Sequence, residues 1–158
     1  MTDQTRWGID QVQVKNKAIK YQKDLVASAM AQVIIDKGLC DMSEIWGSEV
    51  TLYYPGLYAG ATDLVGVYDY EDSIVDFKQS NKPKRKEWVD DYFMQLGAYA
   101  MAHNQVYDTE ITQGVILMCT PDNYFQKFQI KGKEFIKYQH KFLERVDKYY
   151  NDQNKADT

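Results

Sequence analysis

Asp63, Asp76 and Lys78 are the residues whose types and spacing most readily support chemistry. Side chains two apart on a β-strand point to the same face, so Asp76 and Lys78 should face one cleft. If the segment that holds Asp63 pairs with theirs as a hairpin, two carboxylates and an ammonium group come together. Mg²⁺ prefers oxygen ligands, and an ammonium group stabilises negative charge. The trio therefore favours metal-assisted hydrolysis of a phosphodiester.

Three segments around these residues carry a resemblance to a known family. Gly60–Val65 contains Gly-x-x-Asp, Ile74–Lys78 contains Asp-x-Lys, and Gln95 with Tyr99 forms Gln-x-x-x-Tyr. A lone Asp-x-Lys is common, but this ordered set resembles the signature of the PD-(D/E)XK nuclease superfamily. Within it, the chain is similar to the RecB-like exonuclease branch, of the mitochondrial genome maintenance exonuclease type and its phage relatives. The likeness covers about residues 48–150.

The resemblance implies a site for Mg²⁺ or Mn²⁺. Carried over by position, the carboxylates of Asp63 and Asp76 bind the metal, and the main-chain carbonyl of Phe77 is a further ligand. Glu49 matches an upstream acidic position that often completes such a site, and Glu44 is the competing candidate. The resemblance also implies a restriction-endonuclease-like fold.

The same resemblance implies roles for the remaining motif residues. Lys78 orients or deprotonates the attacking water, while Gln95 and Tyr99 line the site on one face of a helix. Related enzymes often supply a metal-binding histidine from an N-terminal helix, but no histidine precedes His103 here. A magnesium site of three carboxylates is therefore the more natural expectation. Attack in line with the leaving 3′-oxygen would leave a 5′-phosphate.

A basic cluster follows Lys78 directly, although the net charge of the chain is −4. Such a cluster favours contact with a phosphate backbone, and the alternative is a solvated loop. Nearby aromatic side chains could stack on bases, or belong to the core or the rim of the site. The candidates for DNA contact are Lys82, Lys84, Arg85, Lys86, Trp88, Tyr92 and His103; for His103 an ordinary surface position is the alternative.

The expected partner is DNA, and an exonuclease acting on single-stranded ends is the first hypothesis, by resemblance alone. A catalytically silent nucleic-acid-binding module of the same fold and an endonuclease on duplex DNA are the alternatives. Two cysteines, Cys40 and Cys119, are too few for an iron–sulfur cluster and are expected to be reduced and buried, as in a cytosolic protein. We expect no signal peptide and no membrane span.

The periodicity of apolar residues predicts the elements that position these residues. Helices are expected over 9–37, 87–104 and 133–150, and strands over 49–54, 59–68, 73–79, 112–120 and 124–130. Residues 41–47 are expected to connect the first helix to the first strand. This order predicts an α/β fold in which helices flank a central mixed sheet. A single domain is expected over 1–151, with a disordered tail over 152–158.

Overall fold

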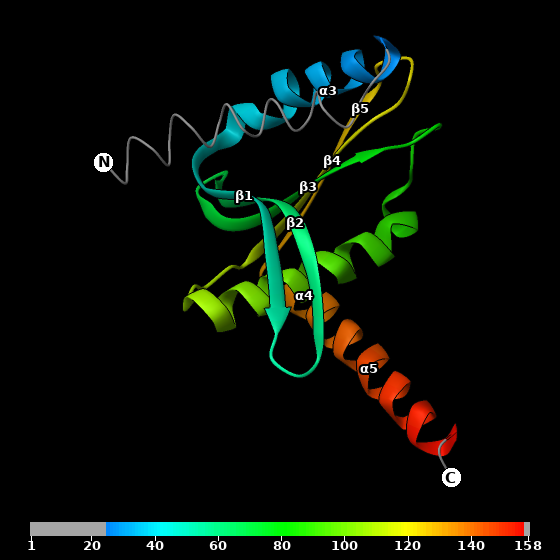
Figure 1. Cartoon of the computed structure of the whole chain (residues 1–158). Coiled ribbons are helices and arrows are strands. Elements are labelled where there is room, and N and C mark those ends of the chain that lie inside the picture. The colour runs from blue at the N-terminus through cyan, green and yellow to red at the C-terminus, as the bar shows by residue number, and fades with distance from the viewer. Residues whose placement is uncertain (1–24, 157–158) are drawn as a thin grey trace.

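The computed structural model describes residues 25–156, and the side chains of residues 29–155. Labelled as in Figure 1, the elements are α3 (Leu25–Gly38), the 3₁₀ helix η2 (Leu39–Asp41), β1 (Met42–Tyr54), β2 (Tyr58–Tyr68), β3 (Glu71–Gln79), the 3₁₀ helix η3 (Lys86–Val89), α4 (Asp90–Tyr107), β4 (Gln113–Cys119), β5 (Phe125–Lys131) and α5 (Gly132–Ala156). This order confirms the predicted α/β fold. The part of the predicted first helix before residue 25 lies outside the described residues.

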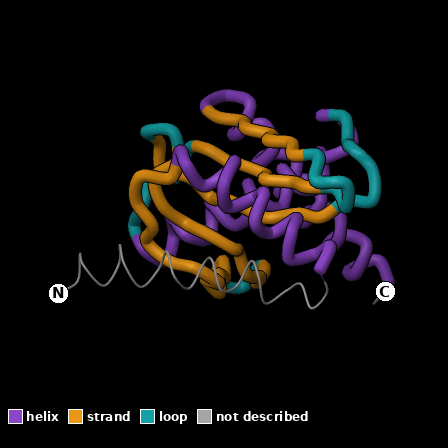
Figure 2. The backbone as a smooth tube through the Cα atoms, turned by 90° about the horizontal axis from the view of Figure 1, so that it is seen from above, coloured by secondary structure: helices purple, strands orange, loops and turns teal. Residues whose placement is uncertain are grey.

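The five strands form one mixed sheet in the order β1-β2-β3-β4-β5. β3 and β4 are parallel, and every other neighbouring pair is antiparallel. A parallel pair needs a long crossover connection, which α4 supplies here. In Figure 1, α3 lies on one side of the sheet and α4 and α5 on the other, and Figure 2 shows the strands among the helices from above.

Each face of the sheet has its own hydrophobic core. Val75 and Leu117 are buried with Ile34 of α3, whereas Ile74 is buried with Phe93 of α4. Successive strand residues thus face opposite sides, as the two-residue period of a strand requires. By the same alternation, Asp76 and Lys78 share the face of Ile74 and lie on the side of α4.

β1 begins earlier than the sequence predicts. The predicted connector over residues 41–47 is wrong, because β1 starts at Met42 and pairs with β2 along this segment. Two register shifts, between Met42 and Glu44 and between Ile45 and Gly47, disturb the alternation of apolar and polar residues. A bulged strand lacks a clean two-residue period, so this part of β1 has no clear signal in the sequence.

The C-terminal helix and one cysteine also differ from expectation. α5 continues to Ala156, so the predicted disordered tail is wrong over residues 152–156. This segment contains no Gly or Pro that would end a helix. Cys119 is buried as predicted, but Cys40 is exposed, just past the end of α3. Within the described residues, no helix combines the length and the apolar character needed to cross a membrane.

Candidate active site

The candidate site forms where β2 and β3 separate. Their pairing runs from Tyr68 opposite Glu71 to Leu64 opposite Val75 and then stops, so the next two residues opposite each other are Asp63 and Asp76. Beyond this point the main-chain N–H of Phe77 donates a hydrogen bond of 2.8 Å to the Asp63 Oδ2 atom. The Asp63 carboxylate thus binds the β3 main chain where the ladder ends, and both acidic residues lie at the opening between the strands.

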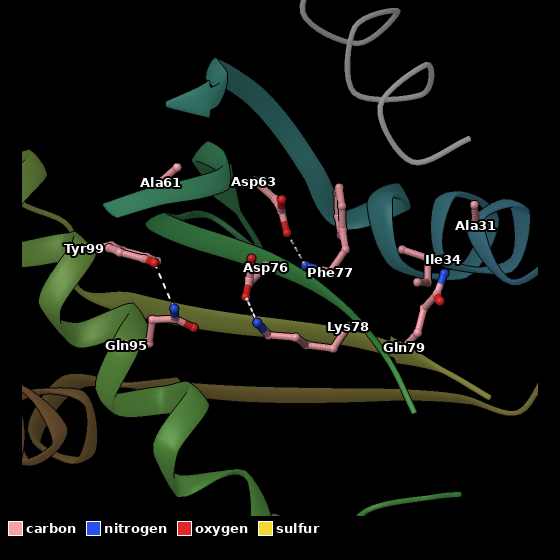
Figure 3. Close-up of a pocket in the computed structure, with 10 residues that line it drawn as sticks. All are labelled: Ala31, Ile34, Ala61, Asp63, Asp76, Phe77, Lys78, Gln79, Gln95 and Tyr99. Atoms are coloured by element: carbon pink, nitrogen blue, oxygen red, sulfur yellow. Dashed lines mark hydrogen bonds and ion pairs between the residues drawn. The ribbon is translucent and has the colours of Figure 1, made fainter. Parts of the chain in front are cut away.

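A pocket of about 440 Å³ occupies this opening (Figure 3). α3, β2, β3 and α4 all contribute to its wall, which consists of Ala31, Ile34, Ala61, Asp63, Asp76, Phe77, Lys78, Gln79, Gln95 and Tyr99. Five residues predicted as catalytic therefore line one pocket. Ala31 and Ile34 were not predicted as site residues, since small and aliphatic side chains carry no chemical signal.

Asp76 and Lys78 form a largely buried ion pair at the centre of the pocket. The Lys78 Nζ atom lies 2.8 Å from the Asp76 Oδ2 atom, and Asp76 is only 7% exposed. Burial raises the pKa of Asp76 to about 7, aided by the hydrogen bond with Asp63 and its negative charge, and opposed by Lys78. The two carboxyl groups therefore resist being charged together.

Lys78 is held by groups on two sides. Its ammonium group lies 4.8 Å from the centre of the Tyr92 ring, on α4, in a cation–π contact. Burial alone would lower the pKa of Lys78, but the negative charges of Asp76 and Asp63 outweigh it, so this pKa is raised. Tyr92 was predicted to contact DNA, which stays a prediction, and the structure shows that it contacts the candidate catalytic lysine.

Gln95 and Tyr99 form a polar pair on the α4 wall of the pocket (Figure 3). The Gln95 Nε2 atom donates a hydrogen bond of 2.8 Å to the Tyr99 hydroxyl oxygen. Burial raises the pKa of Tyr99, and the negative charge of Asp76 adds to the effect. A Cβ atom on Gly60 would lie 2.6 Å from the Tyr99 ring, closer than such contacts occur. Gly60 therefore lets β2 approach the ring.

Gly60→Ala should destabilise the protein by about 1–3 kcal/mol, because the added methyl group would overpack against Tyr99. An ordinary Gly→Ala change within a strand is instead favourable by about 0.5–1 kcal/mol. Denaturant unfolding would measure the free energy of unfolding. The same change in a Tyr99→Ala background, where the ring is gone, should cost nothing. Equal effects in both backgrounds would show that the ring is not the obstacle.

Glu49 and Glu44 do not complete a three-carboxylate site. Glu49 lies between Ser48, opposite Leu64, and Val50, opposite Thr62, so its main chain is level with Asp63. However, Glu49 is exposed, has a left-handed φ of 52° and does not line the pocket. Glu44 pairs with Val67, further from the opening. Among the described residues, no three acidic, histidine or cysteine side chains converge as a metal site.

The predicted DNA-binding cluster divides into residues with different surroundings. Lys82 and Arg85 are exposed on the loop between β3 and η3. The main chain of Lys84 exchanges two hydrogen bonds of 2.8 Å with the Gln126 side chain on β5. Lys86 forms an ion pair of 2.8 Å with Glu134 on α5. The loop is therefore anchored on both sides, and Lys86 is partly neutralised.

His103 does not belong to the site. The prediction that it contacts DNA is wrong, because it is 6% exposed and does not line the pocket. Its ring lies 2.7 Å from the Thr109 hydroxyl oxygen and packs between Trp46 and Tyr107. Burial lowers the pKa of His103, so the ring is neutral at pH 7. His103 lies four residues after Tyr99 on the same side of α4, but it is packed against Trp46 of β1 and Tyr107 of α4.

Comparison with solved structures shows a shared fold. The chain is similar to a protein from Eubacterium rectale named "Putative exonuclease", with a TM-score of 0.52 and 18% sequence identity over 91% of this chain and 60% of that one. The chain thus spans about 60% of the length of that protein. The structure of SSO0001 is more distant, with a TM-score of 0.40 and 14% identity over 90% of this chain and 70% of that one. No family model and no curated protein matches the chain.

Proposed function

We propose that the protein is a metal-dependent deoxyribonuclease whose active site is the pocket around Asp63, Asp76 and Lys78. The observation that carries this proposal is the meeting of two carboxyl groups and an ammonium group where β2 and β3 separate. The shared fold with the protein named "Putative exonuclease" supports a nuclease over other hydrolases. Action as an exonuclease on single-stranded ends is the finer part of the proposal.

The donor groups of the pocket fit a divalent cation. Asp76 is nearly buried and lies beside Asp63, so it is costly for both carboxyl groups to be ionised at once. A bound cation would remove this cost because it neutralises both negative charges. Mg²⁺ commonly takes one or two carboxylates together with water, so a third acidic side chain is not required. Asp63, Asp76 and the carbonyl of Phe77 would hold Mg²⁺ or Mn²⁺. When bound, the cation would polarise the phosphate and lower the pKa of water.

The side chains of the pocket would position the substrate around these carboxylates. The ammonium group of Lys78, fixed by Asp76 and Tyr92, would orient the attacking water and stabilise negative charge on the phosphate. The Tyr99 hydroxyl accepts a hydrogen bond from Gln95, which leaves its own hydrogen to donate toward the pocket. Ala31 and Ile34 would exclude water from one wall.

Addition of Mg²⁺ or Mn²⁺ should raise the melting temperature of the protein, because a cation bound only by the folded state stabilises it. At a cation concentration about 100-fold above the dissociation constant, the gain is roughly 2.7 kcal/mol. Asp63→Asn should abolish most of the rise, whereas Asp152→Asn, on the exposed end of α5, should keep it. An equal rise in both variants would place the cation elsewhere.

Digestion of end-labelled DNA tests the function itself. We expect the protein to degrade linear single-stranded DNA in Mg²⁺ or Mn²⁺ and to be inactive in EDTA. Linear and circular forms of single-stranded and duplex DNA, compared side by side, separate the alternatives. Cutting of circular DNA would identify an endonuclease. Binding of DNA without cutting in either metal would favour the catalytically silent module, for which the relevant observation is that no third acidic side chain of the described residues converges with Asp63 and Asp76.

A further inference from the structure

One face of α4 and η3 connects the pocket to an exposed aromatic surface. Tyr92, Gln95 and Tyr99 follow one another at spacings of three and four residues, so they lie along one side of α4, and Trp88 lies in η3, the 3₁₀ helix that leads into α4. Gln95 and Tyr99 line the pocket, and Tyr92 contacts Lys78. Trp88 precedes Tyr92 by four residues, or roughly 6–8 Å at the rise of an α-helix or a 3₁₀ helix. A strand held at Lys78 would therefore reach Trp88 within a short distance.

Trp88 and Arg85 form a flat, cationic surface at this end of the face. Trp88 is 59% exposed, and the Arg85 guanidinium carbon lies 5.2 Å from the centre of its indole ring. Tryptophan is highly buried on average in folded proteins, whereas here the indole lies open to solvent beside a cation. An indole face and a guanidinium plane are the groups on which nucleic-acid bases stack.

The surface is held rigidly by the loop between β3 and η3, which Figure 1 shows between the end of β3 and the start of α4. The Ser80 N–H donates to the Cys119 carbonyl, and Lys84 is bound on both sides of its main chain by Gln126. The Trp88 N–H donates to the Arg85 carbonyl at 3.0 Å. Because the loop is fixed before a ligand arrives, binding loses little conformational entropy.

Local charge decides on which side of Trp88 a strand would pass. Trp88 also borders a groove of about 590 Å³ between α4 and α5, but that groove mixes acidic and basic side chains. Its Arg145 is already paired with Asp91 at 3.0 Å. The loop side instead presents Lys82, Lys84 and Arg85 with Trp88. Phosphate groups would be attracted to the loop side, where residues 82–85 hold three basic residues and no acidic one.

We propose that Trp88 and Arg85 form a stacking platform for unpaired bases, which makes the site selective for single-stranded DNA. The proposal rests on the proposed function for the location of the cleaved phosphate. Bases in a duplex are stacked on one another and do not offer their faces to a side chain, whereas an unpaired base does. The platform would hold the nucleotide next to the one in the pocket, and the loop cations would contact the intervening phosphates.

Fluorescence anisotropy in EDTA, which prevents cutting by a cation-dependent site, tests the platform through binding alone. The probes are labelled dT12, an abasic oligomer of equal length and charge, and a 12-base-pair duplex. Trp88→Ala should weaken dT12 binding about 10- to 100-fold, and Trp88→Phe should retain most of the affinity. Binding of the duplex and the abasic oligomer should change less than about threefold. Tyr149→Ala, which removes an aromatic side chain of equal exposure on α5, is the matched control.

The outcomes separate this proposal from the nuclease assignment. Unchanged dT12 binding in Trp88→Ala would overturn the platform even if the protein cuts DNA, and so would an equal loss for the abasic oligomer. Failure of the wild-type protein to bind dT12 would also overturn it. Selective loss for dT12 in a protein that never cuts DNA would uphold the platform and reject the nuclease.

Discussion

Replacement of Asp76 by asparagine should lower the rate of DNA cleavage by roughly 10³-fold. Asparagine has the size of aspartate but cannot supply the charge that a divalent cation needs. Asp76 is nearly buried and lines the pocket. Among the described residues, only Asp63 places another carboxyl group on the pocket wall, so little could replace the lost charge. The measurement is single-turnover cleavage of a labelled single-stranded oligonucleotide in Mg²⁺, with Asp152→Asn as the control of equal chemistry at an exposed position.

The loss of activity should come with a gain in stability, which excludes unfolding as its cause. The folded-state pKa of Asp76 is about 7, above the value near 4 of an unfolded chain. Stability from such a group is present below the lower pKa and is lost as the pH rises through the higher one. In EDTA, Asp76→Asn should therefore melt above the wild type at pH 8 and close to it at pH 4. Cleavage at the wild-type rate would remove Asp76 from the mechanism.

Replacement of Lys78 by methionine should lower the cleavage rate by about 10²- to 10³-fold, because a preorganised cation on the phosphate is lost. Methionine keeps an unbranched apolar stem near Tyr92, so the pocket should stay packed. The cleavage rate at saturating DNA should fall, while KM changes little. Lys137→Met, on the exposed side of α5, is the control. A rise in KM with an unchanged maximal rate would instead make Lys78 a binding residue.

The centre of the candidate site was predictable because it depends on short-range periodicity. Asp76 and Lys78 share a face since they lie two apart on one strand. Gln95 and Tyr99 share a face since they lie four apart on one helix. The position of Asp63 required only that β2 and β3 form a hairpin, and their antiparallel pairing confirms it.

The surroundings of the site were less predictable because they depend on contacts between distant segments. Glu49 is level with Asp63, yet its left-handed main chain leaves it exposed, and no sequence period reports such a conformation. His103 follows the spacing of the site residues but is covered by Trp46, from β1. Lys86 belongs to the basic cluster in sequence, but in the structure it forms an ion pair with Glu134 of α5. Each outcome is set by tertiary packing.

Whether Asp63 and Asp76 form a cation-dependent active site is tested most directly by the cleavage rate of single-stranded DNA as a function of cation concentration, for the wild type and Asp63→Asn. We expect no cleavage by the wild type in EDTA and a rate that saturates with added Mg²⁺ or Mn²⁺. Asp63→Asn should remain roughly 10³-fold slower at the same cation concentrations. A wild-type cleavage rate in EDTA equal to the rate in Mg²⁺ or Mn²⁺ would contradict a cation-dependent site built on Asp63 and Asp76. Equal cleavage rates for the wild type and Asp63→Asn would contradict it as well.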